Sequence, residues 1–178
     1  MAVRPITVIG HKALHSPTKK VKEVTEEIRT LVADMFDTME AADGVGLAAN
    51  QVGSRLRIFV YDCPVPEGPN ARGVVVNPVL ERLGTPPPLH SEEDGEGCLS
   101  VPGIYDGVER ASRIRVQALD GEGQSRSIEA DGLLAICIQH EMDHLLGKVF
   151  VEYLSPLKRN RIKTKMLKAQ RDLARDAA

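Results

Sequence analysis

Two histidines in the last third of the chain are spaced so that both could bind one metal ion. The sequence QHEMDHLLG, residues 139–147, contains His140 and His144, and residues four apart on a helix lie on the same face. Glu141 between them completes the pattern His-Glu-x-x-His, which is typical of zinc hydrolases. Apolar neighbours predict a packed helix rather than a solvated one. The pattern therefore predicts a hydrolytic metal site with a carboxylate beside it.

Such a site needs a third protein ligand. Some metallopeptidases supply a histidine in His-x-x-Gly-x-x-His, but Phe150 occupies that position here. Others use a glutamate further downstream, yet no glutamate follows Glu152, which is too close to return to the site. The third ligand must come from upstream or from the helix itself.

Two cysteines compete for this role. Cys98 lies in EGCLS next to Gly97, where the backbone can approach a metal closely. Cys137 lies three residues before His140, but three ligands on one helix would enclose a metal poorly, and its apolar neighbours predict a buried thiol. We therefore prefer Cys98 as the ligand. The alternative is a nucleophilic Cys98 paired with a histidine, although one base would then suffice.

The elements that must position these residues follow from periodicity and turn signals. Helical spacing predicts helices over residues 25–43, 133–147 and 157–175, the last with Ser155 as its cap. Short β-type runs lie at residues 57–61, 73–80, 113–119 and 125–130, separated by turn-forming segments. The pattern predicts an α+β domain over residues 1–178 with antiparallel sheet, a C-terminal helix over residues 156–178, and an exposed acidic loop at residues 92–97.

The bulk composition limits the classes of protein. A chain of 178 residues with 42% apolar residues suits one domain. No segment resembles a secretory signal or the ~18 apolar residues of a membrane span. Three cysteines without a close pair suit a reducing compartment. A net charge of −2 predicts neither DNA nor membrane binding. We expect a cytoplasmic protein.

Three separated segments resemble the motifs of the peptide deformylase family in content, order and spacing. They are GVGLAANQ at residues 44–51, EGCLS at 96–100 and QHEMDHLLG at 139–147. The resemblance implies antiparallel sheets around a central metal-binding HExxH helix, with the C-terminal helix of the helix-tailed form. It also implies a hydrolase that removes the formyl group from the formyl-methionine of newly made polypeptides and releases formate.

The expected mechanism combines a metal with groups of the chain. A divalent metal held by the cysteine and the two histidines would lower the pKa of its bound water, and the resulting hydroxide would attack the formyl carbon. Glu141 would take the water's proton and pass it to the leaving amine. The resemblance assigns stabilisation of the oxyanion to the Gln51 side-chain amide and the backbone N–H of Leu99.

The resemblance also implies a pocket for the methionine side chain. Its walls would be Val45, Gly46, Leu133, Ile136 and Cys137. Arg110 would help to position the substrate chain. Every pocket residue could equally belong to the core. A cysteine and two histidines suit zinc, nickel, cobalt or ferrous iron. The resemblance implies Fe²⁺ as the physiological ion, which a purified sample could have exchanged because such a site is oxidation-prone.

The C-terminal segment has a charge opposite to that of the rest of the chain. Residues 156–178 contain eight Lys and Arg against two Asp. This asymmetry predicts a polyanionic partner, and the resemblance implies the ribosome, near which nascent chains emerge. A solvated helix packed on the body through Leu157, Ile162 and Leu173 is the simpler alternative. A metallopeptidase that cuts internal bonds and a catalytically inactive metal-binding module remain as other functions.

Overall fold

A computed structural model describes residues 2–87 and 95–178 of the chain. These residues form a five-stranded antiparallel sheet in the order β1-β2-β3-β6-β7 and a two-stranded sheet, β4-β5. The strands are β1 (Gly46–Ala48), β2 (Ile58–Cys63), β3 (Ala71–Arg82), β4 (Glu96–Cys98), β5 (Val101–Asp106), β6 (Arg113–Leu119) and β7 (Ser125–Asp131). The helices are α1 (Glu26–Ala41), α2 (Gly132–Leu145) and α3 (Pro156–Asp176), with 3-10 turns η1 (Lys12–His15), η2 (Ala49–Val52) and η4 (Phe150–Tyr153).

Helix α1 begins one residue after its predicted cap. The Thr25 hydroxyl accepts a hydrogen bond from the backbone N–H of Ile28 at 3.4 Å, and two glutamates in the first turn suit the positive end of the helix dipole. Its buried face includes Met35 and Met39, which pack in one cluster with Leu47 of β1. The helix thereby fixes the segment that leads into β1.

The four predicted strands are present as β2, β3, β6 and β7, and all pair antiparallel. Strand β3 extends two residues beyond the predicted run at each end and contains an irregularity between Val76 and Val79. Strands β1 and β4 have three residues each, which is too short for an alternation of apolar and polar residues to be recognised in the sequence. The expected acidic loop differs from the structure: residues 92–94 lie outside the described residues, and Glu96 belongs to β4 with its side chain buried.

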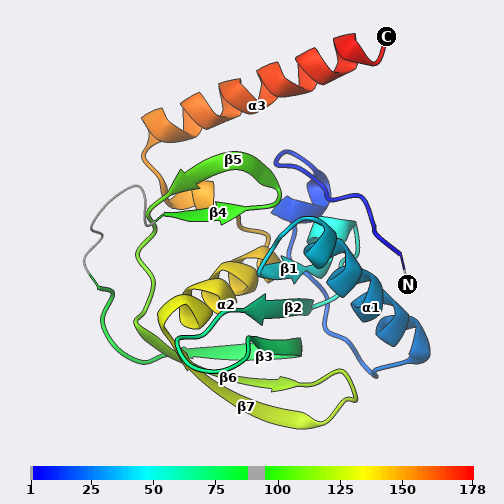
Figure 1. Ribbon diagram of the computed structural model, residues 1–178, viewed down its shortest axis with the longest axis vertical. Helices are drawn as coiled ribbons and strands as arrows, with labels where there is room; N and C mark the ends of the chain where they lie inside the picture. The colour runs from blue at the N-terminus through cyan, green and yellow to red at the C-terminus, as the bar shows by residue number, and fades with distance from the viewer. Residues whose placement is uncertain (1, 88–94) are drawn as a thin grey trace.

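Helix α2 lies between the two sheets, as Figure 1 shows. Every residue from 137 to 145 is buried, because β1 and β2 cover one side of the helix and β4 lies across the other. The helix ends before Gly147, whose φ of +78° favours glycine and where a Cβ would lie 2.8 Å from backbone atoms of Ser16. The α+β architecture with a central HExxH helix is therefore confirmed.

Helix α3 extends beyond the body of the molecule (Figure 1). Ser155 caps it by accepting the backbone N–H of Lys158, with Pro156 in the first turn. Only Ile162 and Met166 on this helix are buried. No helix in residues 2–87 or 95–178 combines the length and apolar composition needed to cross a membrane.

Candidate metal centre

Three potential metal ligands converge where β4 meets α2. Cys98 ends β4, and His140 and His144 lie one turn apart on α2. The Cys98 Sγ lies 3.3 Å from His144 Nε2, and the two Nε2 atoms are 3.2 Å apart. All three ligand atoms lie within 4.8 Å of one another. The structure therefore brings together the three residues that the sequence analysis selected.

The chemistry of these atoms fits a divalent cation. Burial lowers the pKa of His144 well below its usual value, so its imidazole is neutral. Burial also opposes protonation of His140, but hydrogen bonds with Cys98 and Glu96 raise the pKa of this imidazole overall. Two ring nitrogens and a sulfur facing one another at this separation repel unless a proton or a cation lies among them. Cysteine and histidine are preferred ligands of zinc and related metals, so the donor set fits such an ion.

His140 is oriented by a buried ionic network. Its Nδ1 donates to Glu96 Oε1 at 2.8 Å, which leaves Nε2 directed at the other ligands. Arg110 donates two hydrogen bonds to Glu96, at 3.0 and 2.6 Å, and one to Asp143 at 2.6 Å. The Tyr153 hydroxyl donates to Asp143 at 3.1 Å. The Glu96 carboxylate therefore holds the tautomer and the direction of the His140 ring.

The structure places Glu96 and Arg110 differently from what the sequence analysis expected. Glu96 was missed as part of the site, although it is the first residue of the EGCLS motif. Arg110 was expected at the substrate, but its side chain is only 5% exposed and is neutralised by Glu96 and Asp143. In the described part of the chain it faces this network rather than the cleft beside the metal ligands.

Glu141 lies beside the ligand cluster and faces the cleft. Its Oε1 lies 2.5 Å from the position that a Cβ on Gly46 would occupy. Its Oε2 is buried without a hydrogen-bond partner among the described residues. Burial raises the pKa of this carboxyl to about 7. A buried carboxylate with a free oxygen next to a cleft can exchange a proton with a bound molecule.

Gln51 is buried, and both the oxygen and the nitrogen of its side-chain amide have hydrogen-bond partners. Its Oε1 accepts from the backbone N–H of Ala48 at 2.9 Å, while Nε2 donates to the Ser100 hydroxyl at 3.1 Å and lies 3.7 Å from Cys98 Sγ. The amide N–H groups therefore point towards the ligand cluster. Leu99 follows Cys98 directly, and both Gln51 and Leu99 line the cleft.

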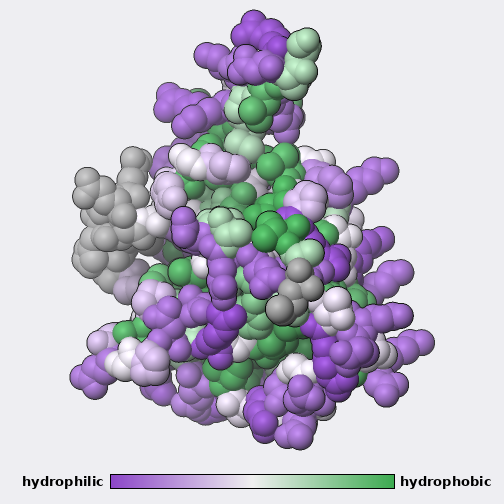
Figure 2. Space-filling view, turned by 45° about the vertical axis from the view of Figure 1, so that its right-hand side comes forward, coloured by the Kyte–Doolittle hydropathy of each residue, from purple (hydrophilic) through white to green (hydrophobic). Residues whose placement is uncertain are grey.

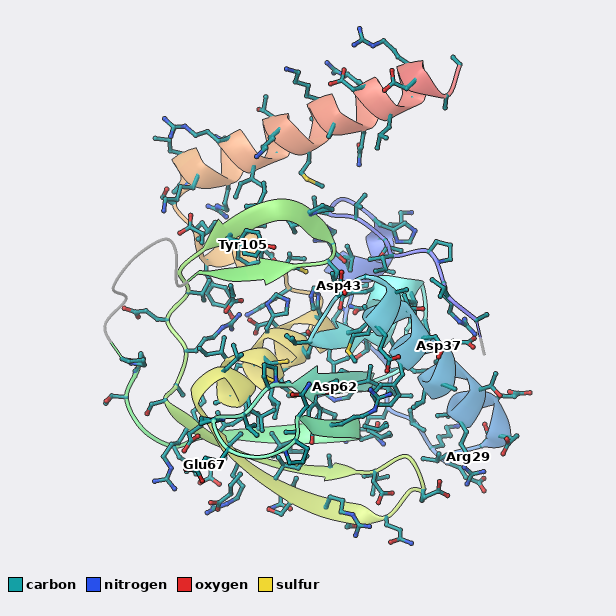
Figure 3. The ribbon with its side chains drawn as sticks, in the orientation of Figure 1. Arg29, Asp37, Asp43, Asp62, Glu67 and Tyr105 are labelled. Carbon is teal, nitrogen blue, oxygen red and sulfur yellow. The ribbon has the colours of Figure 1, made fainter. Side chains whose placement is uncertain are left out.

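A cleft of about 450 Å³ opens beside these groups. All five residues expected in the pocket line it: Val45, Gly46, Leu133, Ile136 and Cys137. Tyr105 and Asp43, which Figure 3 labels, also belong to its lining. The arrangement offers an apolar recess next to a hydrolytic centre.

Cys137 contributes to the cleft wall rather than to the ligand cluster. Its Sγ donates to the Val45 carbonyl at 3.5 Å. A hydrogen bond with Cys63 and burial raise the pKa of the Cys137 thiol well above its usual value. A thiol in this setting stays protonated and inert.

Comparisons with known proteins agree with this geometry. The sequence model of the polypeptide deformylase family matches residues 3–160. Peptide deformylase of Acinetobacter baumannii is 50% identical over 176 residues, which cover 99% of this chain and 97% of that protein. Peptide deformylase 1 of Burkholderia multivorans is 51% identical over 171 residues, covering 96% of this chain and 91% of that protein.

Solved structures give the same result. The peptide deformylase of Ehrlichia chaffeensis in complex with actinonin matches with a TM-score of 0.89 and 42% identity, covering 96% of this chain and 99% of that one. A peptide deformylase from Legionella pneumophila matches with a TM-score of 0.86 and 44% identity, covering 98% and 99%. This chain therefore belongs to the peptide deformylase family of metallohydrolases.

Proposed function

We propose that this enzyme hydrolyses the formyl group from the N-terminal formyl-methionine of newly made polypeptides and releases formate. The observation that carries the proposal is the convergence of Cys98, His140 and His144 beside Glu141 and an apolar cleft. Family membership supports deformylation in general. We propose the cytoplasm as its location, where such chains are made.

Cys98, His140 and His144 are the proposed ligands of one divalent metal ion, with Fe²⁺ as the physiological ion and zinc, nickel or cobalt as substitutes. An ion bound there supplies Lewis acidity, polarising a carbonyl oxygen and lowering the pKa of water in the cleft. The chain provides the ligand atoms already close together, and ionic partners for one of the two imidazoles.

Glu141 is the proposed general base and acid. It accepts a proton from the attacking water and returns one to the amine nitrogen as the C–N bond breaks. The free Oε2 and the burial of the carboxylate support this role. Positive charge at the loaded site would lower its pKa from about 7 and keep it ionised before the reaction.

Gln51 and the backbone N–H of Leu99 are the proposed donors to the oxyanion that develops on the formyl oxygen when the formyl carbon is attacked. The amide of Gln51 is held at Oε1 by Ala48, so its Nε2 is preorganised rather than free to rotate. Such donors act because they need no reorientation during the reaction.

The Glu96–Arg110–Asp143 network is proposed to position His140. Arg110 thus acts on a metal ligand through Glu96, not on the substrate. The buried Arg110 neutralises two carboxylates that would otherwise face each other in a medium of low dielectric constant. Removing the arginine leaves both charges without compensation.

The side chain of the substrate methionine is proposed to occupy the recess formed by Val45, Leu133, Ile136 and Cys137. These residues give an apolar wall without a charged group, which suits an unbranched thioether. Gly46 lies where any side chain would collide with Glu141 and Cys137, so this position lets the peptide backbone pass close to the reacting groups.

The proposed activity is tested by formate release from formyl-Met-Ala, with acetyl-Met-Ala and an internal Met-Ala peptide as competing substrates. Metal content is measured in the same sample. We expect turnover of the formyl peptide alone. Cleavage of the internal peptide would instead identify a metallopeptidase, and a loaded site without formate release would identify an inactive metal-binding protein.

Helix α3 belongs to the same proposed domain as the catalytic centre. We propose that it docks on the ribosome. Figure 2 shows many hydrophilic residues on the projecting helix at the top of the molecule, beside a strip of hydrophobic ones. Leu157 and Leu173 are exposed, contrary to the simpler alternative in which they pack on the body. Among the described residues, the helix is attached to the body by the buried Ile162 and Met166 and by an ion pair between Lys158 and Asp106 at 2.9 Å. A basic, weakly anchored helix suits a polyanionic partner.

Charge reversal tests this docking without removing the anchoring residues. We would change the exposed Lys165, Lys168 and Arg171 to Glu and measure ribosome co-sedimentation at low and moderate salt. Co-sedimentation should be lost, and in the wild type it should weaken steeply with salt because counterions are released on binding. Hydrolysis of the short formyl peptide should be unchanged.

The matched control reverses three exposed lysines elsewhere: Lys12, Lys20 and Lys22. It changes the net charge by the same amount, so unchanged co-sedimentation of this control would assign the effect to α3. Equal loss in both variants would mean that net charge, not this helix, governs the association.

A further inference from the structure

Asn50 lies between the end of the metal-binding helix and the N-terminal segment. Its side chain is completely buried. The Nδ2 atom donates to the carbonyl of Ala13 at 3.2 Å and to the carbonyl of His144 at 2.5 Å. Because both neighbours of this atom are carbonyl oxygens, it must be the amide nitrogen, and the orientation of the amide is determined.

The two ligand histidines differ in what their second ring nitrogen contacts. The Nδ1 of His140 donates to the buried carboxylate of Glu96. The Nδ1 of His144 is buried and has no partner among the residues that the structure describes. A metal-ligating histidine almost always donates its other ring N–H to an acceptor, which fixes the tautomer and the ring direction. His144 therefore needs an acceptor.

The unpaired atoms in the described part of the chain indicate which acceptor is available. Within residues 2–87 and 95–178, three buried side-chain nitrogen or oxygen atoms lack a partner: His144 Nδ1, Asn50 Oδ1 and Glu141 Oε2. When Nε2 of His144 binds a metal, Nδ1 carries the proton and is a donor, whereas the two oxygens are acceptors. Glu141 belongs to the cleft beside Gly46. The amide nitrogen of Asn50 already donates to the main-chain carbonyl of His144.

We propose that Asn50 is a positioning residue for His144. Its amide nitrogen holds the main chain of His144, and its Oδ1 accepts the Nδ1–H of the ring through one buried water molecule. The neutral amide thus does for His144 what the Glu96 carboxylate does for His140. The inference rests on the proposed metal site and adds a residue that selects the tautomer of one ligand.

The same helix end offers a matched control. The next carbonyl, that of Leu145, accepts hydrogen bonds from the backbone N–H and the hydroxyl of Thr18, at 2.9 and 2.8 Å. Thr18→Val removes the hydroxyl contact and keeps the N–H contact. It loosens the end of α2 as Asn50 variants do, but leaves the His144 ring untouched.

The experiment compares Asn50→Leu, Asn50→Asp and Thr18→Val as full-length proteins. Binding of Co²⁺ is titrated by its visible absorption, the Nδ1–H signal of His144 is followed by NMR in the Zn²⁺ form, and Tm is measured without metal. We expect Asn50→Leu to weaken Co²⁺ binding about 10- to 100-fold and to lose the slowly exchanging Nδ1–H. Thr18→Val should stay within about threefold of wild type and keep that signal.

Asn50→Asp separates positioning from folding. It keeps an acceptor for the Nδ1–H but turns a carboxylate towards the carbonyls of Ala13 and His144, so Tm should fall at least as far as in Asn50→Leu while Co²⁺ binding stays stronger. Co²⁺ affinity that simply follows Tm across the three variants would overturn the proposal. Failure of the wild-type protein to bind Co²⁺ would instead refute the metal site itself.

Discussion

Gly46→Ala should impair catalysis by displacing the Glu141 carboxylate. The φ of Gly46 lies outside the left-handed region, so alanine is tolerated by the backbone. The added methyl group would lie 2.5 Å from Glu141 Oε1 and 2.9 Å from Cys137 Sγ. An ordinary contact needs roughly 3.4 Å, so the carboxylate must withdraw by almost 1 Å.

The magnitude follows from the reaction's demand for alignment. A misplacement of about 1 Å can cost about 10²-fold in rate, and we expect a loss of this order in kcat. Overpacking costs about 1–3 kcal/mol of folding free energy. The lower end applies here because the group that moves is the end of a flexible side chain. The enzyme should remain folded and loaded with metal.

The assay measures kcat and KM for formyl-Met-Ala, together with metal content and Tm. Gly121→Ala is the matched control, because its added methyl group would meet Val74 at 3.7 Å, an ordinary van der Waals contact. Its kinetics should be unchanged. A folded, loaded Gly46→Ala enzyme with wild-type kcat would refute the reasoning, and a rise in KM alone would show that the methyl group blocks the substrate instead.

Three further predictions address the ligands, the base and the fold. Cys98→Ser should lose tight metal binding, whereas Cys137→Ser should keep the metal and most activity; equal metal loss in both would refute the ligand assignment. Glu141→Gln should keep fold and metal yet fall below about a tenth of wild-type turnover, because an amide cannot accept the water's proton. The hydrogen bond from Arg4 holds the pKa of Asp34 below its usual 3.8, so this carboxylate stabilises the fold above that pH and the contribution is lost as the pH falls through the lowered pKa. Asp34→Asn should therefore lower Tm at pH 7 but not at a pH well below 3.8, and an equal deficit at both would contradict the charge-based account.

The metal-binding helix and its ligands could be predicted because their signals are local. The spacing of His140 and His144 fixes their relative direction once a helix forms, and α2 is long and apolar enough to predict. Cys98 followed from its glycine neighbours and from the exclusion of downstream ligands. In each case the chemistry limited the choice before any tertiary contact was known.

The orientation of the ligands could not be predicted, because it depends on contacts between distant segments. Glu96 reads as part of an acidic stretch until β4 places it against His140. Arg110 reads as a substrate contact until two carboxylates surround it. Asn50 is one polar residue in a loop motif, and only the packing of η1 and α2 around it determines the direction of its amide.

Two histidines on one helix have a fixed spacing, but their rings can rotate. The directions of the two imidazoles are therefore fixed only when other segments of the chain pack against α2. The β4–β5 sheet supplies Cys98 and Glu96, and η2 supplies Asn50 next to the N-terminal segment. Each of these contacts exists only in the folded chain. A cation that binds this arrangement and not the unfolded chain must therefore stabilise the whole fold, by a free energy that grows with the logarithm of its affinity. The segments that orient the imidazoles are for that reason also the segments whose unfolding releases the metal.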